Sequence, residues 1–164
     1  MDNYICINGK KAELTEEQMK ALGIELPKKN PFERLPKTKP FYYITNKGNV
    51  EFGVEAKDFH CQQLHNVGNY CTDKAIMEQR ALHEILNRLL WRYSMEHGGD
   101  KIDWGNVSDK YAIYYESDTK KYKVACWQTV YYSGNVYFRT ENVALAAIEA
   151  IINPFIAAHP EFKF

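Results

Sequence analysis

The sequence lacks the features that would place it in several specialised classes of protein. Its 164 residues include 21 Lys and Arg and 21 Asp and Glu, so its formal net charge is zero. A strongly basic nucleic-acid-binding coat and an acidic tail are therefore excluded, although local patches are not. No apolar run approaches the length of about 18 residues that crosses a membrane, and Met1-Asp2-Asn3-Tyr4 does not begin a signal peptide.

Catalytic motifs are also missing. The sequence has no serine in a nucleophile elbow and no glycine-rich phosphate loop. His83-Glu84 begins like a zinc-protease helix, but Asn87 stands where the second histidine is needed. Glu116 and Asp118 flank a turn and show no sign of the shared burial that a catalytic carboxylate pair needs. We therefore predict a protein that is not an enzyme and uses no cofactor.

The cysteines are few and scattered. Four are present, without the pattern of a disulfide framework, which is typical of the reduced thiols of a cytoplasmic protein. His60, Cys61, His65 and Cys71 form the one cluster of His and Cys, but they lack the paired knuckles of a structural zinc site. We expect Cys71 to face the core and the histidines to lie in a loop. The sequence leaves open whether these four residues bind a metal ion.

Residues 1–40 differ from the rest of the chain. Tyr4–Ile7 alternates like a strand, and Asn8-Gly9 is a strong signal for a two-residue hairpin turn. Thr15 and Gln18 form a capping box, which predicts a helix over about 16–22 that ends at Gly23.

A proline-rich connector follows this helix. Four of the six prolines lie between Pro27 and Pro40, which predicts an extended and irregular segment. The connector has one acidic residue, Glu33, and is the one locally basic segment of the chain. Its basic residues are Lys28, Lys29, Arg34, Lys37 and Lys39.

From Phe41 onward the chain contains a weak internal repeat, with copies at 41–97 and 104–158. Each copy reads as two strands joined by a turn, a Gly-Asn pair, a short aromatic strand, a threonine and a helix. The hairpin strands are predicted at 41–44, 50–54, 111–115 and 121–129, the Gly-Asn pairs are 68–69 and 134–135, and the threonines, expected as helix N-caps, are Thr72 and Thr140.

Two long helices are predicted, at about 73–96 and 141–152. Apolar residues recur in the first at spacings of three, four and seven, so one face is buried. Pro154 is expected to end or kink the second helix. Helices that follow hairpins predict an α+β domain over 41–164, with one antiparallel sheet and both long helices on one face.

Aromatic residues concentrate between Tyr111 and Phe138. Successive strand residues point to opposite faces, so Tyr114 and Tyr115 cannot both face the helices. One sheet face is therefore expected to display tyrosines to solvent, with Trp127 on the opposite side from Cys126. Tyr and Trp are enriched at interaction surfaces, although tyrosines also simply suit strands. The predicted partner-binding residues are Tyr114, Trp127, Tyr131 and Tyr137, with Arg80, Arg88 and Arg92 on the outer face of the first helix.

These segments carry a resemblance to a known group. The chain resembles a diffuse group of small proteins from phages and prophages of low-GC Gram-positive bacteria. The segments that carry this resemblance are 42–44, 68–72, 111–115, 122–124 and 136–141. The resemblance covers about 41–152, with departures at Cys71, where we expect an aromatic residue, and at the polar loop 57–66, which has no counterpart. It implies a counter-defence factor in the cytoplasm of a bacterial host, of the kind that includes anti-CRISPR proteins.

Three functional hypotheses follow. The first is a phage accessory protein that binds and inhibits a bacterial defence protein, foremost a CRISPR effector nuclease with its guide RNA. The second is a module that stacks unpaired bases on the tyrosines and holds phosphates with the basic connector. The third is a sponge for a small signalling nucleotide in a pocket of tyrosines.

Overall fold

The computed structural model describes residues 4–7, 10–23, 30–105 and 108–163. The predicted turn at Asn8-Gly9, and Lys28 and Lys29 of the connector, lie outside these residues. The chain combines helices with antiparallel sheets, which confirms the α+β class.

The N-terminal elements match the sequence pattern. Strand β1 (Tyr4–Ile7) pairs with β2 (Lys10–Glu13), and helix α1 (Glu16–Ala21) follows. The capping box is confirmed: the Gln18 amide donates to the Thr15 hydroxyl at 3.2 Å, and the Thr15 amide donates to the Gln18 side chain at 2.9 Å.

The first repeat folds into a hairpin between two helices. Strands β3 (Pro40–Ile44) and β4 (Val50–Val54) pair in antiparallel register, and Cys71 adds a single bridge to Tyr42. Helix α2 (Phe59–Asn66) covers one face, and α3 (Lys74–Glu96) covers the other. The core on the α2 side contains Phe41, Cys61 and Tyr70, and the core on the α3 side contains Ile44, Cys71, Met77 and Ala81.

The second repeat has the same order of strands. Strands β5 (Lys110–Glu116) and β6 (Lys121–Trp127) form the hairpin, and β7 (Tyr137–Phe138) pairs with β5 as Cys71 pairs with β3. A continuous helical run then follows, built from α4 (Glu141–Ala147), the π-helical turn η2 (Ile148–Ile152) and α5 (Asn153–Ala158). The registers make Tyr42 equivalent to Tyr111, and Cys71 equivalent to the buried Phe138.

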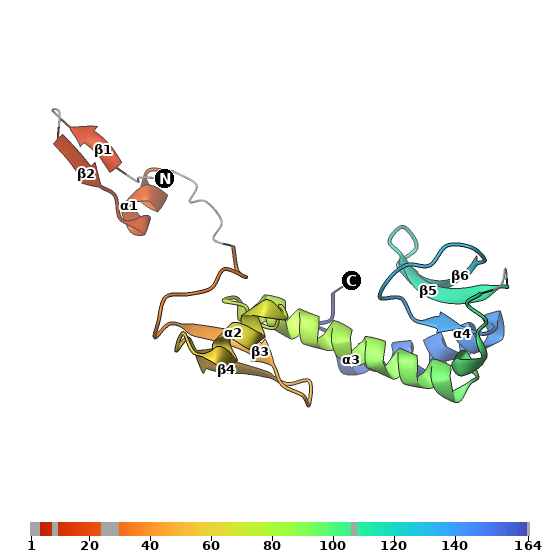
Figure 1. Ribbon diagram of the computed structural model, residues 1–164. Helices are drawn as coiled ribbons and strands as arrows, with labels where there is room; N and C mark the ends of the chain where they lie inside the picture. The colour runs from red at the N-terminus through yellow and green to blue at the C-terminus, as the bar shows by residue number, and fades with distance from the viewer. Residues whose placement is uncertain (1–3, 8–9, 24–29, 106–107, 164) are drawn as a thin grey trace.

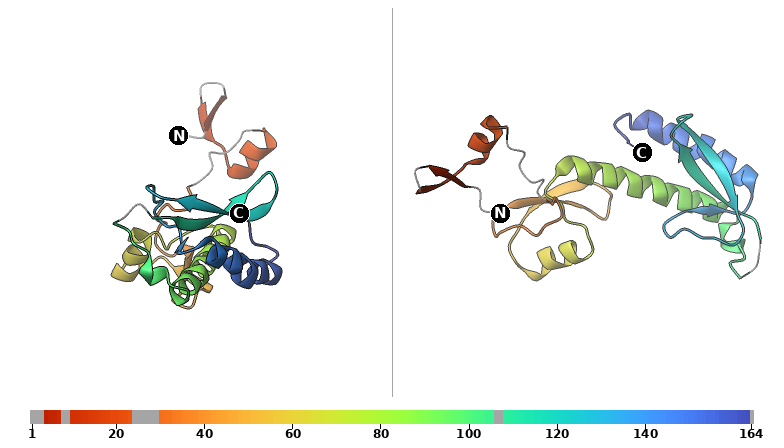
Figure 2. Two further views of the ribbon diagram at one scale, coloured as in Figure 1. Left: turned by 90° about the vertical axis from the view of Figure 1, so that its right-hand side faces the viewer. Right: turned by 90° about the horizontal axis from the view of Figure 1, so that it is seen from above.

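Helix α3 connects the two repeats. Figures 1 and 2 show one hairpin near each end of this helix. Met77 and Ala81 lie in the first core, whereas Leu86 packs with Ile148, Ile152 and Phe155 in the second. A short 3-10 helix, η1 (Gly99–Lys101), follows α3 and leads toward β5.

The structure corrects the expectation of a single sheet. The strands of 41–164 form two separate sheets, β3–β4 and β6–β5–β7. The 23 residues of α3 extend over about 34 Å, so each hairpin packs on its own part of the helix. Helix α3 begins one residue later than expected, because Asp73 rather than Thr72 is its N-cap. Thr140 is the N-cap of α4, as predicted.

Pro154 does not end the last helix. A proline inside a helix removes one backbone donor and crowds the carbonyl four residues earlier. Here the π-helical turn η2 immediately precedes the proline segment, and the wider turn accommodates both effects. The helical run therefore continues to Ala158 and buries Phe155.

The same helical run corrects the expectation that no apolar segment of this chain is long enough to cross a membrane. Glu141–Ala158 is long and apolar enough to cross a membrane by length and composition. Its apolar residues Ala144, Ala147, Ile152 and Phe155 are nevertheless buried in the two cores that it forms with α3 and the second sheet. This is the arrangement of an amphipathic helix that packs one face against a core, while its other face, with Leu145, is exposed.

A buried carboxylate fixes the connector to the first repeat. Arg34 donates to both oxygens of Glu55, at 3.3 and 3.1 Å, and the Tyr70 hydroxyl donates to the same carboxylate at 3.0 Å. The backbone amide of Lys57 also donates to the Glu55 carboxylate, at 2.7 Å. Burial raises the pKa of Glu55, but the hydrogen bonds from Arg34, Lys57 and Tyr70 outweigh it and leave the pKa below its ordinary value.

We expect Glu55→Gln to lower the melting temperature at pH 7 by about 5 °C or more, because the Arg34 guanidinium then faces an amide instead of a carboxylate. Because the folded-state pKa of Glu55 is lowered, its charge stabilises the fold above the ordinary pKa of 4.5. The difference between wild type and variant should therefore shrink as the pH falls through the folded-state value. Thermal denaturation between pH 7 and pH 3 measures this.

The matched control is Glu33→Gln, on an exposed side chain of the same connector. It should leave the melting temperature within about 1 °C of wild type. An equal loss in both variants, or a Glu55→Gln difference that does not depend on pH, would contradict the assignment of Glu55 as a charged structural centre.

Candidate protein-binding surface

The aromatic residues of the second repeat divide between the two faces of its sheet. Tyr111, Ile113 and Tyr115 face the helices, together with Tyr122, Val124 and Phe138. Tyr114 and Trp127 belong to the opposite, outer face by strand alternation, and Cys126 has the opposite parity from Trp127. The expectation that Tyr114 and Tyr115 point to different sides agrees with this register.

The outer face carries a cluster of rings, which we call the aromatic cluster. Trp104 contacts Tyr131 and Tyr137 edge to face, with ring centroids 5.3 and 5.5 Å apart. Trp127 contacts Tyr132 in the same way at 5.1 Å. Edge-to-face contacts are a favoured geometry for aromatic pairs and fix the rings relative to one another. The cluster consists of Trp104, Trp127, Tyr131, Tyr132 and Tyr137.

A buried lysine lies beneath this cluster. The Lys110 side chain is fully buried, and its ammonium donates to the carbonyl and the hydroxyl of Ser108 at 3.1 and 3.3 Å. The same nitrogen lies 5.0 Å from the ring centre of Tyr131 and 5.9 Å from that of Trp104. These are cation–π distances, so the ammonium favours the positions that both rings occupy.

Tyr137 is not displayed to solvent, which corrects the sequence-based expectation. Only 6% of this residue is exposed, because Trp104 and Tyr131 cover its ring. Its hydroxyl accepts a hydrogen bond from the Tyr132 amide at 2.7 Å, and its carbonyl accepts one from the Ser94 hydroxyl at 2.5 Å. Tyr137 therefore supports the loop that carries Tyr131 and Tyr132.

Other rings of this region do reach solvent. Trp104 is 51% exposed, Tyr131 is 41% exposed, and Tyr114, on the same sheet face, is 42% exposed. Trp127 is half-buried. The sequence analysis did not select Trp104, which precedes β5, or Tyr132 as partner-binding residues. The signal that could have identified them is their proximity in the sequence to an aromatic strand. Val130 and Tyr132 are also exposed. We call the surface that contains the exposed residues Trp104, Tyr114, Val130, Tyr131 and Tyr132 the recognition face.

The three predicted arginines of α3 take part in ion pairs along the helix. Glu84 accepts from Arg80 at 3.0 Å and from Arg88 at 3.1 Å, and Arg92 lies 3.9 Å from Glu96. Arg80 also donates to the Gly68 carbonyl. Each pair joins residues four apart, as is typical of an exposed helix face, and the structure does not place these arginines in the aromatic cluster.

The basic connector differs from the phosphate-binding segment considered from the sequence. Arg34 is engaged with Glu55 and with the Gln62 side chain. Burial and the carboxylate fix this guanidinium inside the first repeat, so it is not presented to a nucleic acid. Lys37 and Lys39 are exposed.

The His and Cys cluster is also rearranged relative to expectation. His60 and His65 lie in α2 rather than in a loop, because Asp58 caps this helix by accepting from the Cys61 amide at 2.8 Å. Cys71 is buried in the core, as predicted. Cys61 lies in the core on the α2 side and Cys71 in the core on the α3 side. Among the described residues no group of three or more His, Cys, Asp or Glu side chains is placed to hold a metal ion.

No protein-family model, curated protein or solved structure matches this chain.

The role of the Tyr137 hydroxyl can be tested with Tyr137→Phe. We expect a loss of about 1 kcal/mol in the free energy of unfolding, because the Tyr132 amide loses its acceptor. Hydrogen exchange at the Tyr132 amide should become faster, while exchange at the amides of β7 should be unchanged. Tyr114→Phe, at an exposed ring of the same sheet, is the control and should leave both quantities unchanged. Unaltered Tyr132 exchange in Tyr137→Phe would contradict the proposed support of the loop.

Proposed function

We propose that this protein is a non-enzymatic binding protein whose recognition face docks on a partner protein. The observation that carries the proposal is the exposure of Trp104 and Tyr131 in the aromatic cluster and of Tyr114 on the same sheet face. Exposed apolar surface of this kind costs solubility and is typical of interaction sites. Trp and Tyr also dominate the energetically important positions of protein interfaces.

The rigidity of the recognition face supports the same function. Ring contacts, the Lys110 ammonium and the Tyr137 hydroxyl each restrain the loop that carries Tyr131 and Tyr132. A surface that is ordered before binding loses less conformational entropy when a partner docks. This property favours a stable complex.

The resemblance to phage proteins supplies the class of partner that we propose. The partner is a bacterial defence protein, foremost a guide-RNA-loaded CRISPR effector nuclease, which the protein would inhibit in the host cytoplasm. Docking of an aromatic face onto the nuclease would block access of its DNA target without any chemistry by the inhibitor.

The direct test is target-DNA cleavage by purified, guide-loaded effector nucleases from low-GC Gram-positive bacteria, measured with increasing amounts of this protein. We expect inhibition by wild type and at least a tenfold weaker effect from the double variant Tyr114→Ala/Tyr131→Ala. Phe52→Ala removes an exposed aromatic side chain from β4 in the other repeat and should inhibit like wild type. Equal inhibition by a folded double variant would refute the proposed face, and no inhibition of any effector would refute the proposed partner.

A second measurement separates protein binding from the binding of single-stranded nucleic acid. Because Arg34 is engaged with Glu55, we expect no saturable binding of a fluorescent oligothymidine at about 150 mM salt, measured by anisotropy. Binding that weakens steeply with salt and that is lost in Lys37→Ala/Lys39→Ala would instead favour the nucleic-acid module. Lys47→Ala/Lys101→Ala, which removes two exposed lysines outside the connector, serves as the charge-matched control.

A further inference from the structure

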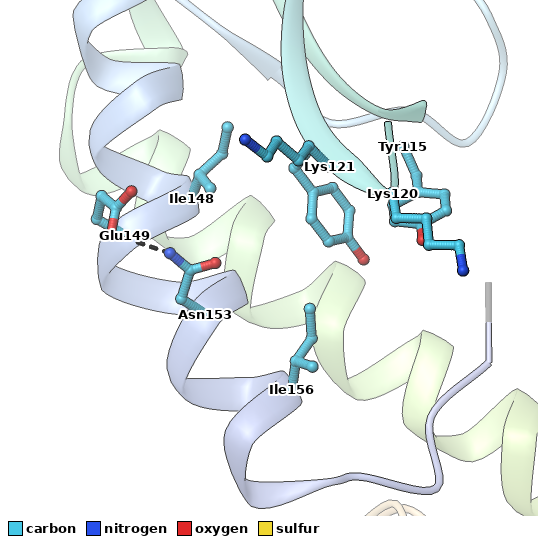
Figure 3. Close-up of a pocket in the computed structure, with 8 residues that line it drawn as sticks. Tyr115, Lys120, Lys121, Ile148, Glu149, Asn153 and Ile156 are labelled. Carbon is cyan, nitrogen blue, oxygen red and sulfur yellow. Dashed lines mark hydrogen bonds between the residues drawn. The ribbon is translucent and has the colours of Figure 1, made fainter. Parts of the chain in front are cut away.

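A pocket lies in the second repeat, where the helix-facing rings of Tyr115 and Tyr122 approach the last helical run. It has a volume of about 380 Å³ and lies between the end of the β5–β6 hairpin and the last helical run (Figure 3). This volume is at the small end of the range for ligand pockets, about 300–1,000 Å³. The lining residues used below include Tyr115, Lys121, Tyr122, Ile148, Glu149, Asn153 and Ile156.

Two tyrosine rings form the hairpin wall of the pocket. Tyr115 and Tyr122 pack edge to face with ring centroids 5.3 Å apart. Burial, with a smaller effect of Tyr115, raises the pKa of Tyr122 to about 12, so its hydroxyl is neutral at physiological pH. Ile148 and Ile156 contribute aliphatic surface from the helix. Aromatic and aliphatic walls of this kind suit a flat heterocycle, which can stack on tyrosine.

The helix wall contributes a carboxylate that accepts one hydrogen bond from a neighbouring side chain. Glu149 belongs to the π-helical turn, and the Asn153 amide donates to one of its oxygens at 2.9 Å (Figure 3). Single π-helical turns within α-helices occur often at functional sites. An ionised carboxylate accepts hydrogen bonds only and can take two parallel N–H donors. Among the common bases, guanine presents such a pair on one edge, its N1–H and its N2 amino group.

A cation lies at the mouth of the pocket. Figure 3 shows the Lys121 side chain extending toward the helix wall near Ile148, whereas Lys120 points the other way. Lysine is an effective point-charge partner for phosphate. The pocket thus offers a stacking surface, an acceptor for paired N–H groups and a positive charge. We propose that it binds a guanine nucleoside monophosphate.

Isothermal titration calorimetry with GMP, AMP, guanosine and inorganic phosphate tests this proposal. Wild type should bind GMP with a Kd below about 1 mM, and more tightly than AMP or phosphate. Glu149→Gln should weaken GMP binding at least tenfold and remove the preference over AMP, because the paired acceptor is lost. Lys121→Ala should weaken GMP binding and leave guanosine binding unchanged. Lys47→Ala, on the other hairpin, should behave like wild type.

Several results would overturn the proposal. These are no saturable binding of GMP by the folded wild type, equal affinity for AMP and GMP, phosphate binding as tight as GMP, or full GMP affinity in Glu149→Gln. Glu149 and Lys121 are exposed, so both variants are expected to fold, and their melting temperatures verify this. The pocket is not lined by Trp104, Tyr114 or Tyr131 of the recognition face, so nuclease inhibition and GMP binding can each fail without the other.

Discussion

The fold depends on one helix that both repeats share. A two-stranded hairpin is marginal by itself and needs a packed partner. Helix α3 supplies that partner twice, through Met77 and Ala81 for the first hairpin and through Leu86 for the core around the second. Near its C-terminal end, Ser94 donates to the Tyr137 carbonyl and so ties the helix to β7. Because each hairpin needs α3 to cover its apolar face, the two repeats are expected to fold together.

The repeats preserve a scaffold while changing what it presents. Tyr70 and Tyr137 occupy equivalent positions, and each hydroxyl accepts a backbone amide of the segment that covers it, from Leu35 and Tyr132 respectively. In the first repeat α2 covers the outer sheet face, whereas in the second an irregular loop does so. An irregular cover leaves rings exposed, and this difference explains why the recognition face belongs to the second repeat.

Buried charges reinforce both arrangements. The strand register places Lys110 where the first repeat has Phe41, and both side chains are buried. The Lys110 ammonium donates to the Ser108 oxygens and makes cation–π contacts, whereas the Glu55 carboxylate accepts hydrogen bonds from Arg34 and Tyr70. A buried charge is tolerated only when its partners are in place. Such groups therefore penalise any rearrangement of the loops that hold the recognition face and the connector.

The sequence by itself determined the elements, because capping and periodicity act locally. Strand alternation placed Trp127 and Cys126 on opposite faces of the sheet, and the capping box predicted the start of α1. The predicted order of the hairpin strands and the two long helices is the order observed. The sequence analysis did not predict α2, although Asp58 is a residue type favoured at helix N-caps. Only the tertiary structure decided that there are two sheets, that Tyr137 is covered, and that Arg34 pairs with Glu55, 21 residues away. The physical reason is that alternation fixes which side of a sheet a residue occupies, whereas exposure depends on distant segments that fold over that side.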